Sequence, residues 1–408
     1  MKALVFDPTI PRYLATRALS AVSRSALWGP LAPLQYRDLP DPPLPGDDWV
    51  RVGVTLGGVC GSDLSTIHLT GSPAASVVTS FPCVLGHENV GTIVEVGRGV
   101  RDLAAGLRVT VEPTLPCAAR GIDPPCANCA AGNYNICLRY TEGHISPGLS
   151  IGFCRDTGGS WGETFVAHRS QVFPVPDAVS DERALMVEPL AVALHPFLRV
   201  PPLSGQTVLV VGGGVIGQSV VAVLRALGTP VRIVVLAKYP FQERMARQLG
   251  ADETVGLRRG DGHYEALSEL LGAKLHRPIF GHRVPIGGGA DVTVECVGSG
   301  RSIADALWWT RPGGTMILLG VAALPRGVDW TPIWLNELRV LGSYIYGVES
   351  YEGRRVRTMD LVLEWIERGR LDPSPLVTHR FPLNDYAAAL TTAMGKAESQ
   401  AFKVALRP

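Results

Sequence analysis

The distribution of apolar residues divides the chain into three stretches. Residues 1–188 carry short β-branched runs, as at 49–60, 89–97 and 108–113, separated by frequent glycines and prolines. This alternation with many turn signals predicts antiparallel strands in a barrel-like domain. Residues 189–342 instead alternate apolar strands with helical segments. That βαβ series predicts an α/β domain with a parallel sheet covered by helices.

Residues 343–408 return to strand, helix, loop and strand, and we expect them to rejoin the first domain. The segment 358–369 has helical spacing and a closing glycine. Within the middle stretch, residues 258–289 look like an insertion ahead of the strand at 290–298. Because the insertion is rich in Arg and His, we expect it to be a solvated excursion.

Length and composition fit a two-domain globular protein. The chain has 408 residues, 46% hydrophobic and 18% charged, which excludes disorder driven by low hydrophobicity. The net charge of +1 gives no basic excess that would indicate nucleic acid. The longest apolar stretch, 208–224, contains four glycines and favours a strand, turn and helix over a membrane span. With no signal-peptide core, a soluble cytoplasmic protein is expected.

Four of the eight cysteines lie close together in the chain. They are Cys117, Cys126, Cys129 and Cys137. In a cytosolic chain, clustered thiols are more often metal ligands than disulfides. Four thiolates close a tetrahedral shell around Zn²⁺ and leave no open position, so this zinc would be structural. Asp123 rivals Cys117 as the fourth ligand, but structural sites favour thiolate.

A glycine-rich turn follows the strand at 208–211 and opens a helix that we expect to run through Leu224. Residues 212–217 fit the pattern G-x-G-x-x-G in this strand–turn–helix context, which predicts dinucleotide binding. Gly212 permits the tight turn, Gly214 lets the backbone approach a pyrophosphate, and Gly217 lets the helix pack on the strand. Val215 and Ile216 open the helix, whose free N–H groups face the phosphate.

The next strand, at 231–237, ends where an NAD enzyme usually places Asp or Glu to bind the ribose 2′-hydroxyl. This chain has Ala237, Lys238 and Tyr239 instead. No carboxylate repels a 2′-phosphate, Lys238 could attract one, and Tyr239 could stack on adenine. The segment therefore favours NADP(H) over NAD(H). The alternative is that Lys238 is merely exposed and that the protein does not discriminate strictly between the two cofactors.

Residues suited to a catalytic metal occur in three separate segments. Cys60 lies in GGVCGSD, His87 and Glu88 in VLGHENVG, and Glu188 in MVEPLAVALHPF. A thiolate, an imidazole and a carboxylate suit Zn²⁺ with one position left open. Each residue alone is more often part of a core. Together with a structural zinc loop and a dinucleotide motif, they indicate a catalytic zinc.

These motifs resemble the zinc-dependent medium-chain dehydrogenases, the superfamily of alcohol, sorbitol and threonine dehydrogenases. The resemblance spans Trp49–Lys403 and rests on GVCGSD, GHENVGTIVEVG, the four-cysteine loop, EPLAVALH, the glycine turn and RPGG at 311–314. It implies a GroES-like catalytic domain joined to a Rossmann domain, with the active site in the cleft between them. It also implies Cys60 and His87 as direct zinc ligands. Glu88 and Glu188 share the remaining role, as ligand or as partner of a zinc-bound water.

The resemblance further implies an activity. Zinc lowers the pKa of an alcohol, and the alkoxide carbon gives hydride to C4 of the nicotinamide. A secondary alcohol or polyol, or the matching carbonyl, is the expected substrate of a homo-oligomeric enzyme. Ser62 is a candidate for the first residue of a relay that carries the alcohol proton to solvent. The polyol and threonine enzymes often carry His where this chain has Ser65, and the nearest histidine is His68.

Three other functions remain to be weighed. A zinc-dependent epimerase or lyase would use the nicotinamide only transiently on the same scaffold. A non-enzymatic binding protein would have no need for Cys60, His87 and Glu188 together, and a zinc-free quinone reductase is disfavoured for the same reason.

Overall fold

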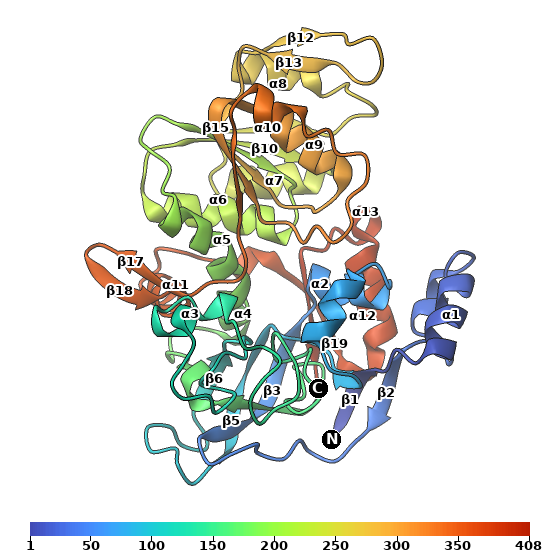
Figure 1. Ribbon diagram of the computed structural model, residues 1–408, viewed down its shortest axis with the longest axis vertical. Coiled ribbons are helices and arrows are strands. Elements are labelled where there is room, and N and C mark those ends of the chain that lie inside the picture. The colour runs from blue at the N-terminus through green and yellow to red at the C-terminus, as the bar shows by residue number, and fades with distance from the viewer. The chain divides into compact units, whose positions relative to one another are not determined.

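The computed structural model describes residues 1–408, which form two compact units (Figure 1). The first unit consists of Met1–Glu188, Tyr346–Val348 and Val356–Pro408, and the second of Pro189–Ile345 and Glu349–Arg355. The second unit therefore extends past residue 342 and takes in most of a hairpin, β17 (Val348–Tyr351) and β18 (Arg354–Arg357).

The first unit is built on a seven-stranded sheet, mostly antiparallel. Its strand order is β19–β20–β3–β5–β6–β8, and β7 also pairs with β3. The strands are β3 (Trp49–Gly58), β5 (Asn89–Val96), β6 (Arg108–Val111), β7 (Thr164–His168), β8 (Val172–Pro174), β19 (Val377–Pro382) and β20 (Lys403–Arg407). Because β20 pairs with β3, the end of the chain returns to the first domain's sheet.

Smaller elements complete this unit. A three-stranded sheet contains β1 (Lys2–Phe6), β2 (Leu34–Asp38) and β4 (Cys83–Val84), and α1 (Ile10–Leu19) lies in the long connection between β1 and β2. The other helices are α2 (Gly61–Ile67), α3 (Ala127–Ala130), α4 (Asp181–Leu185), α11 (Thr358–Glu367), α12 (Tyr386–Met394) and α13 (Lys396–Ser399).

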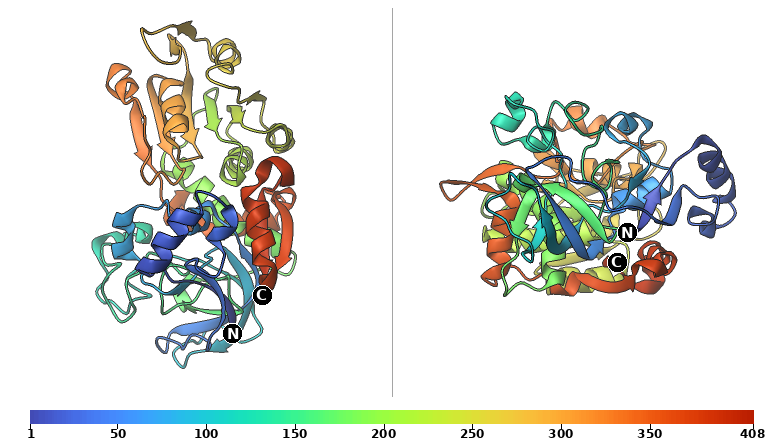
Figure 2. Two further views of the ribbon diagram at one scale, coloured as in Figure 1. Left: turned by 90° about the vertical axis from the view of Figure 1, so that its right-hand side faces the viewer. Right: turned by 90° about the horizontal axis from the view of Figure 1, so that it is seen from below.

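The second unit is a six-stranded parallel sheet with helices on both faces, as its alternating pattern predicted (Figure 2). The order β11–β10–β9–β14–β15–β16 reverses direction between β9 and β14, where doubly wound folds bind ligands. The strands are β9 (Thr207–Val211), β10 (Arg232–Ala237), β11 (Glu253–Gly256), β14 (Ala290–Glu295), β15 (Thr310–Leu318) and β16 (Arg339–Gly342).

Four helices cover the sheet: α6 (Val215–Leu227), α7 (Pro240–Gln248), α8 (Tyr264–Leu271) and α9 (Gly300–Trp308). The second unit also contains α10 (Thr331–Leu335) and nearly all of α5 (Val187–Arg199). Helices α8 and α9 share a buried cluster with one face of β9 and β10. Helix α6 ends about one turn beyond the predicted Leu224, at a left-handed Gly228.

The 258–289 insertion corrects one expectation. It is not wholly solvated, because Tyr264, Leu267 and Leu271 of α8 are buried in the core of the second unit. Their spacing of three and four residues places them on one face of the helix. Only the hairpin of β12 (Lys274–His276) and β13 (Val284–Ile286) carries a loop with fully exposed apolar side chains.

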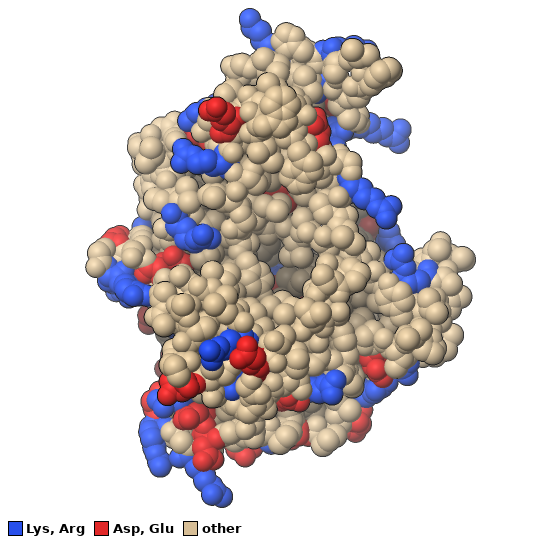
Figure 3. Space-filling view, in the orientation of Figure 1, with Lys and Arg blue, Asp and Glu red and all other residues tan.

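The surface agrees with the balanced charge. On the face shown in Figure 3, basic and acidic side chains are scattered and form no continuous patch of one sign. None of the helices is long and apolar enough to cross a membrane.

Candidate zinc and cofactor sites

The ends of two neighbouring strands bring the first candidate ligands together. Strands β3 and β5 are antiparallel, with Gly57 opposite Asn89, so the residues after β3 meet those before β5. Cys60 is the N-cap of α2, just beyond β3, and His87 and Glu88 immediately precede β5. One ligand atom from each of Cys60, His87 and Glu88 lies within 4.8 Å of the others.

Asp63 orients this cluster. Its carboxylate is fully buried, accepts a hydrogen bond from the Cys60 backbone N–H at 3.0 Å, and lies 3.3 Å from Nδ1 of His87. Burial alone would lower the pKa of His87, but Asp63 and Cys60 raise it well above its usual value. With Nδ1 facing Asp63, Nε2 is the nitrogen available to a metal. Our sequence reasoning missed Asp63, although it lies in the same motif as Cys60.

Glu88 is already paired with a buried lysine. The Lys403 ammonium donates to both carboxylate oxygens of Glu88 at 2.5 Å and to the Val59 carbonyl at 3.3 Å. Burial alone would lower the pKa of Lys403, but the adjacent Glu88 raises it. Gly58 makes room for the pair, because a Cβ there would lie 2.0 Å from Glu88 Oε2.

Glu188 occupies the first turn of α5 and is buried. Burial raises its pKa to about 7; the nearby His87 opposes this rise and Glu88 adds to it. Its carboxylate is not part of the 4.8 Å cluster, and no protein group donates a hydrogen bond to it. Glu188 is thus a buried carboxylate next to the cluster without a committed partner.

The donor set of this region fits zinc. A thiolate, an imidazole and a carboxylate are typical of catalytic zinc sites that keep one position open. Ser62 lies half-buried in the first turn of α2. Ser65 donates its hydroxyl hydrogen to the Gly61 carbonyl at 3.0 Å, so its side chain is bound to its own helix.

The four-cysteine loop forms a second cluster. The sulfur atoms of Cys117 and Cys137 are 3.7 Å apart, and those of Cys126 and Cys137 are 4.0 Å apart. Zn–S bonds of about 2.3 Å in a tetrahedron place sulfurs about 3.8 Å apart. The sulfur of Cys129 completes the group, so that all four sulfurs lie within 4.8 Å of one another, and Asp123 does not belong to it. None of the eight cysteines forms a disulfide. The loop therefore fits zinc with four thiolates.

A buried arginine holds the lobe around this loop. Arg120 has no exposed surface, and its guanidinium donates to the carbonyls of Leu115 at 3.0 Å, Glu142 at 2.9 Å and Gly148 at 2.6 Å. These bonds tie together segments that have few other contacts with a core. Nothing in the sequence distinguishes Arg120 from a surface arginine.

The glycine turn of the second unit fits a dinucleotide. Gly212 has φ of +113°, a conformation that side chains disfavour. A Cβ at Gly217 would lie 1.8 Å from the Gly212 carbonyl oxygen, so this glycine is required for helix–strand packing. A Cβ at Gly214 would meet nothing within 4 Å, which leaves its backbone open to a ligand. Val215 and Ile216 follow in the first turn of α6.

The residues after β10 form a stacked turn. Ala237 ends the strand and is buried, while Lys238 is exposed with its ammonium 5.1 Å from the centre of the Tyr239 ring. Tyr239 stacks on Phe241, with 5.7 Å between ring centres. Gln242 Oε1 accepts from the backbone N–H groups of Lys238 and Tyr239, which fixes the turn.

Five large aromatic residues of the chain could line a substrate site or belong to the core, and core is the expected place for each. Trp161, Trp309 and Tyr346 are fully buried, as expected. The prediction is wrong for Tyr344, which is 40% exposed, and for Trp308, which is only partly buried and donates to Asp329.

Comparison with known proteins gives consistent matches. The family model described as "Alcohol dehydrogenase GroES-like domain" matches residues 46–177, and that described as "Zinc-binding dehydrogenase" matches residues 215–362. L-idonate 5-dehydrogenase from Vitis vinifera is 33% identical over 332 residues, covering 81% of this chain and 80% of the relative. Sorbitol dehydrogenase from Arabidopsis thaliana is 32% identical over 343 residues, covering 83% of each chain.

Among solved structures, a protein from Sinorhizobium meliloti 1021 assigned as a zinc-binding dehydrogenase and bound to NADP is similar over the whole chain. It has a TM-score of 0.74 and 26% sequence identity, and the match covers 100% of this chain and 99% of that protein.

Proposed function

The chain belongs to the zinc-dependent medium-chain dehydrogenase superfamily, and from this premise we propose which of its residues carry out the reaction. It is an oxidoreductase of the alcohol dehydrogenase type that uses zinc and a nicotinamide cofactor. The hydride passes between a secondary alcohol or polyol, or the matching carbonyl, and the nicotinamide. An epimerase or lyase is not favoured, since the named relatives are dehydrogenases.

We propose that Cys60, His87 and Glu188 are the protein groups of the catalytic zinc, with Glu188 binding it directly or through water. Proximity favours Glu88, which lies within 4.8 Å of Cys60 and His87. However, both oxygens of Glu88 already bind the Lys403 ammonium, and leaving that charge buried and unpaired would cost about 3–5 kcal/mol. The free, buried carboxylate of Glu188 is the observation that carries the proposal.

The remaining residues prepare the site. Bound zinc supplies Lewis acidity toward the substrate oxygen, and bound nicotinamide supplies a hydride acceptor. The Asp63 carboxylate, 3.3 Å from Nδ1 of His87, leaves Nε2 as the nitrogen that would bind the metal. Glu88 and Lys403 form a neutral buried pair beside Cys60. Ser62 is proposed to carry the alcohol proton toward solvent, because the hydroxyl of Ser65 is bound to its own helix.

The metal and cofactor assignments extend this proposal. The four-cysteine loop holds a second, structural zinc ion, supported by its sulfur–sulfur distances. NADP(H) is preferred over NAD(H), supported by the absence of a carboxylate at Ala237 and by the exposed cation of Lys238. A polyhydroxylated secondary alcohol is the proposed substrate, since two of the relatives are an L-idonate 5-dehydrogenase and a sorbitol dehydrogenase.

Assembly and location belong to the same proposal. A homo-oligomer, a dimer or tetramer, is supported by the open edge of β16, which pairs only with β15. A cytoplasmic location is supported by the eight free thiols, which persist in reducing compartments.

The experiment compares Cys60→Ser with Cys154→Ala, a buried thiol in the core of the first unit. Initial rates are measured with a panel of secondary alcohols and both nicotinamides, alongside NADPH binding. Cys60→Ser is expected to lower turnover by about a thousandfold or more while NADPH binding is retained, because Lewis-acid assistance is worth several kcal/mol. Cys154→Ala should keep both. Full turnover in Cys60→Ser would contradict the assignment.

A further inference from the structure

We propose that the 258–289 insertion completes the site for the 2′-phosphate of NADP(H), with Arg258 acting together with Lys238 across the ends of two neighbouring strands. The inference rests on the proposed preference for NADP(H). It assigns a binding role to Arg258, which sequence analysis placed in a solvated excursion.

The sheet register brings these two residues to the same edge of the sheet, with Arg258 one position beyond Leu257, the residue opposite Lys238. Strands β10 and β11 are parallel neighbours, with Ala237 opposite Gly256. The Leu257 backbone N–H donates to the Ala237 carbonyl at 2.7 Å, so the pairing continues one residue beyond β11. Because both strands run in the same direction, Lys238 and Arg258 leave the sheet at the same edge. This is the edge at which doubly wound folds bind the adenosine ribose.

A cavity opens between these strand ends and α8. Its volume is about 640 Å³, within the range of ligand sites. Lys238, Arg258 and His263 contribute to its lining with Gly256, Leu257 and other residues of β11, α7 and α8. The cavity lies entirely within the second unit.

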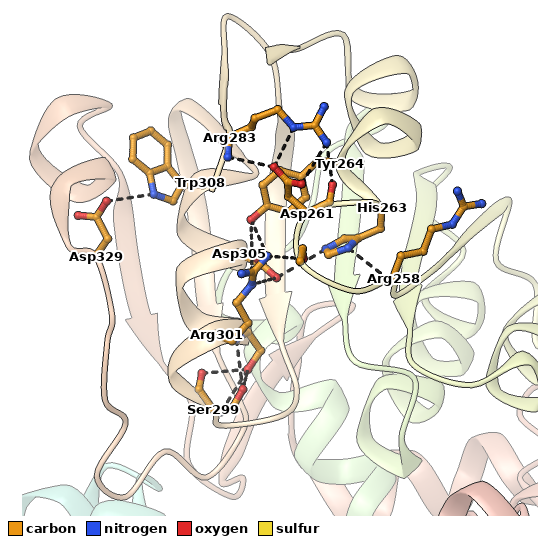
Figure 4. Close-up of polar contacts among 12 residues, drawn as sticks. Arg258, Asp261, His263, Tyr264, Arg283, Ser299, Arg301, Asp305, Trp308 and Asp329 are labelled. Carbon is orange, nitrogen blue, oxygen red and sulfur yellow. Dashed lines mark hydrogen bonds and ion pairs between the residues drawn. The ribbon is translucent and has the colours of Figure 1, made fainter. Parts of the chain in front are cut away.

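The two cations in this cavity have no anionic partner in the protein. Neither the Arg258 guanidinium nor the Lys238 ammonium forms an ion pair or side-chain hydrogen bond; Lys238 only lies over the Tyr239 ring. In contrast, Arg283 pairs with Asp261, and Arg301 pairs with Asp305. Figure 4 shows the Arg258 side chain pointing away from that cluster. An unpaired guanidinium next to an ammonium suits a phosphate.

The insertion is anchored so that Arg258 keeps its place. Tyr264 donates to Asp305 at 2.5 Å, and Arg301 lies 3.1 Å from the same carboxylate (Figure 4). Arg283 donates to Asp261 at 2.8 Å. His263 is buried beside this network, with Nδ1 3.5 Å from the backbone nitrogen of Arg258. Tyr264 and Asp305 are thus positioning residues for the segment that carries Arg258.

Two carboxylates also line the cavity. Glu243 is committed to protein partners, because it accepts from Thr254 Oγ1 at 3.1 Å and from Arg247 at 3.4 Å. Glu269 is exposed on α8, where water screens its charge. Both disfavour an anion near them. A phosphate in this cavity therefore depends on the cations of Lys238 and Arg258 to offset these two charges.

The test uses Arg258→Ala and, as a matched control, Arg259→Ala, the adjacent exposed arginine that does not line the cavity. Dissociation constants are measured for adenosine 2′,5′-bisphosphate and 5′-AMP by calorimetry, and for NADPH and NADH by fluorescence. Arg258→Ala is expected to weaken the bisphosphate and NADPH by about tenfold or more, because it removes a charge-assisted contact. Arg259→Ala should change them less than about twofold, and 5′-AMP and NADH should be unaffected in both.

Three results would overturn the inference: unchanged bisphosphate binding in Arg258→Ala, an equal loss for 5′-AMP, or a wild type that binds both nucleotides equally. Arg258→Lys should recover part of the bisphosphate affinity. Failure of the proposed function gives a different pattern. If alcohol is oxidised with NAD but not with NADP, the phosphate site is contradicted and the proposed dehydrogenase activity still stands. If bisphosphate binding depends on Arg258 but neither nicotinamide supports alcohol oxidation, only the proposed dehydrogenase activity is contradicted.

Discussion

The two candidate metal sites of the first unit are built in opposite ways. The four-cysteine loop takes all its ligands from residues 117–137 and uses one chemical type. The proposed catalytic site would take Cys60, His87 and Glu188 from three distant segments, with Asp63 beside His87 and the Glu88–Lys403 pair close by. A closed thiolate shell needs only four sulfurs at the right distances. A site that must keep an open position also depends on its surroundings, and this difference can be tested.

The largest effect is expected where the catalytic cluster depends on a buried charge. Lys403→Met leaves Glu88 charged, buried and without its cation, which should destabilise the first unit by about 3–5 kcal/mol. The double variant Lys403→Met/Glu88→Gln should recover much of this loss, because no uncompensated charge remains. Urea unfolding of the three proteins measures the effect. Equal stability of wild type and Lys403→Met would show that the buried pair does not support the site.

An intermediate effect is expected in the four-cysteine lobe. Arg120→Met removes the guanidinium donor of the Leu115, Glu142 and Gly148 carbonyls, which should destabilise this lobe because buried acceptors lose their partner. The rate at which a chelator removes zinc from this loop should rise, and alcohol turnover should change little. Arg139→Met, on the same loop with a partly exposed side chain, is the control. Equal zinc-release rates in both variants would contradict the role of Arg120.

The smallest effect is a pH dependence confined to the catalytic cluster. In the metal-free chain, burial raises the pKa of Glu188 to about 7. Below that pH its carboxyl group is protonated, and this proton competes with zinc. Zinc affinity at this site should therefore increase as the pH rises through about 7. Glu188→Gln should bind zinc more weakly and lose this part of the dependence, as measured by competition with a chelator. The same pH profile in both proteins would assign the proton to another group.

The same contrast explains what the sequence could predict. The four-cysteine loop and the glycine turn were recognisable because their residues are close in the chain and their spacing reflects their chemistry. Fold class followed from the alternation of strands and helices, and the parallel sheet confirms it. Cys60, His87 and Glu188 were predicted from motifs rather than from spacing, and the fold brings Cys60 and His87 together with Glu88.

What the sequence did not reveal lies in pairings that only the fold creates. Lys403 lies 315 positions from Glu88, and no local pattern links them. Arg120 resembles a surface residue until its surrounding carbonyls are seen. Helix α8 was misread because neighbouring arginines and histidines hid the apolar spacing of Tyr264, Leu267 and Leu271. The role proposed for Arg258 depends on the pairing of β10 with β11, which brings Arg258 and Lys238 to one cavity.

The most direct test of the account is the zinc content per chain of the wild type, Cys60→Ser and Cys126→Ser, measured by elemental analysis on the purified full chain. We expect two zinc ions in the wild type. Cys60→Ser should hold one and remain as stable as the wild type, whereas Cys126→Ser should lose the loop zinc and much of its thermal stability. Two zinc ions retained in Cys60→Ser, or only one in the wild type, would contradict a separate catalytic zinc at Cys60.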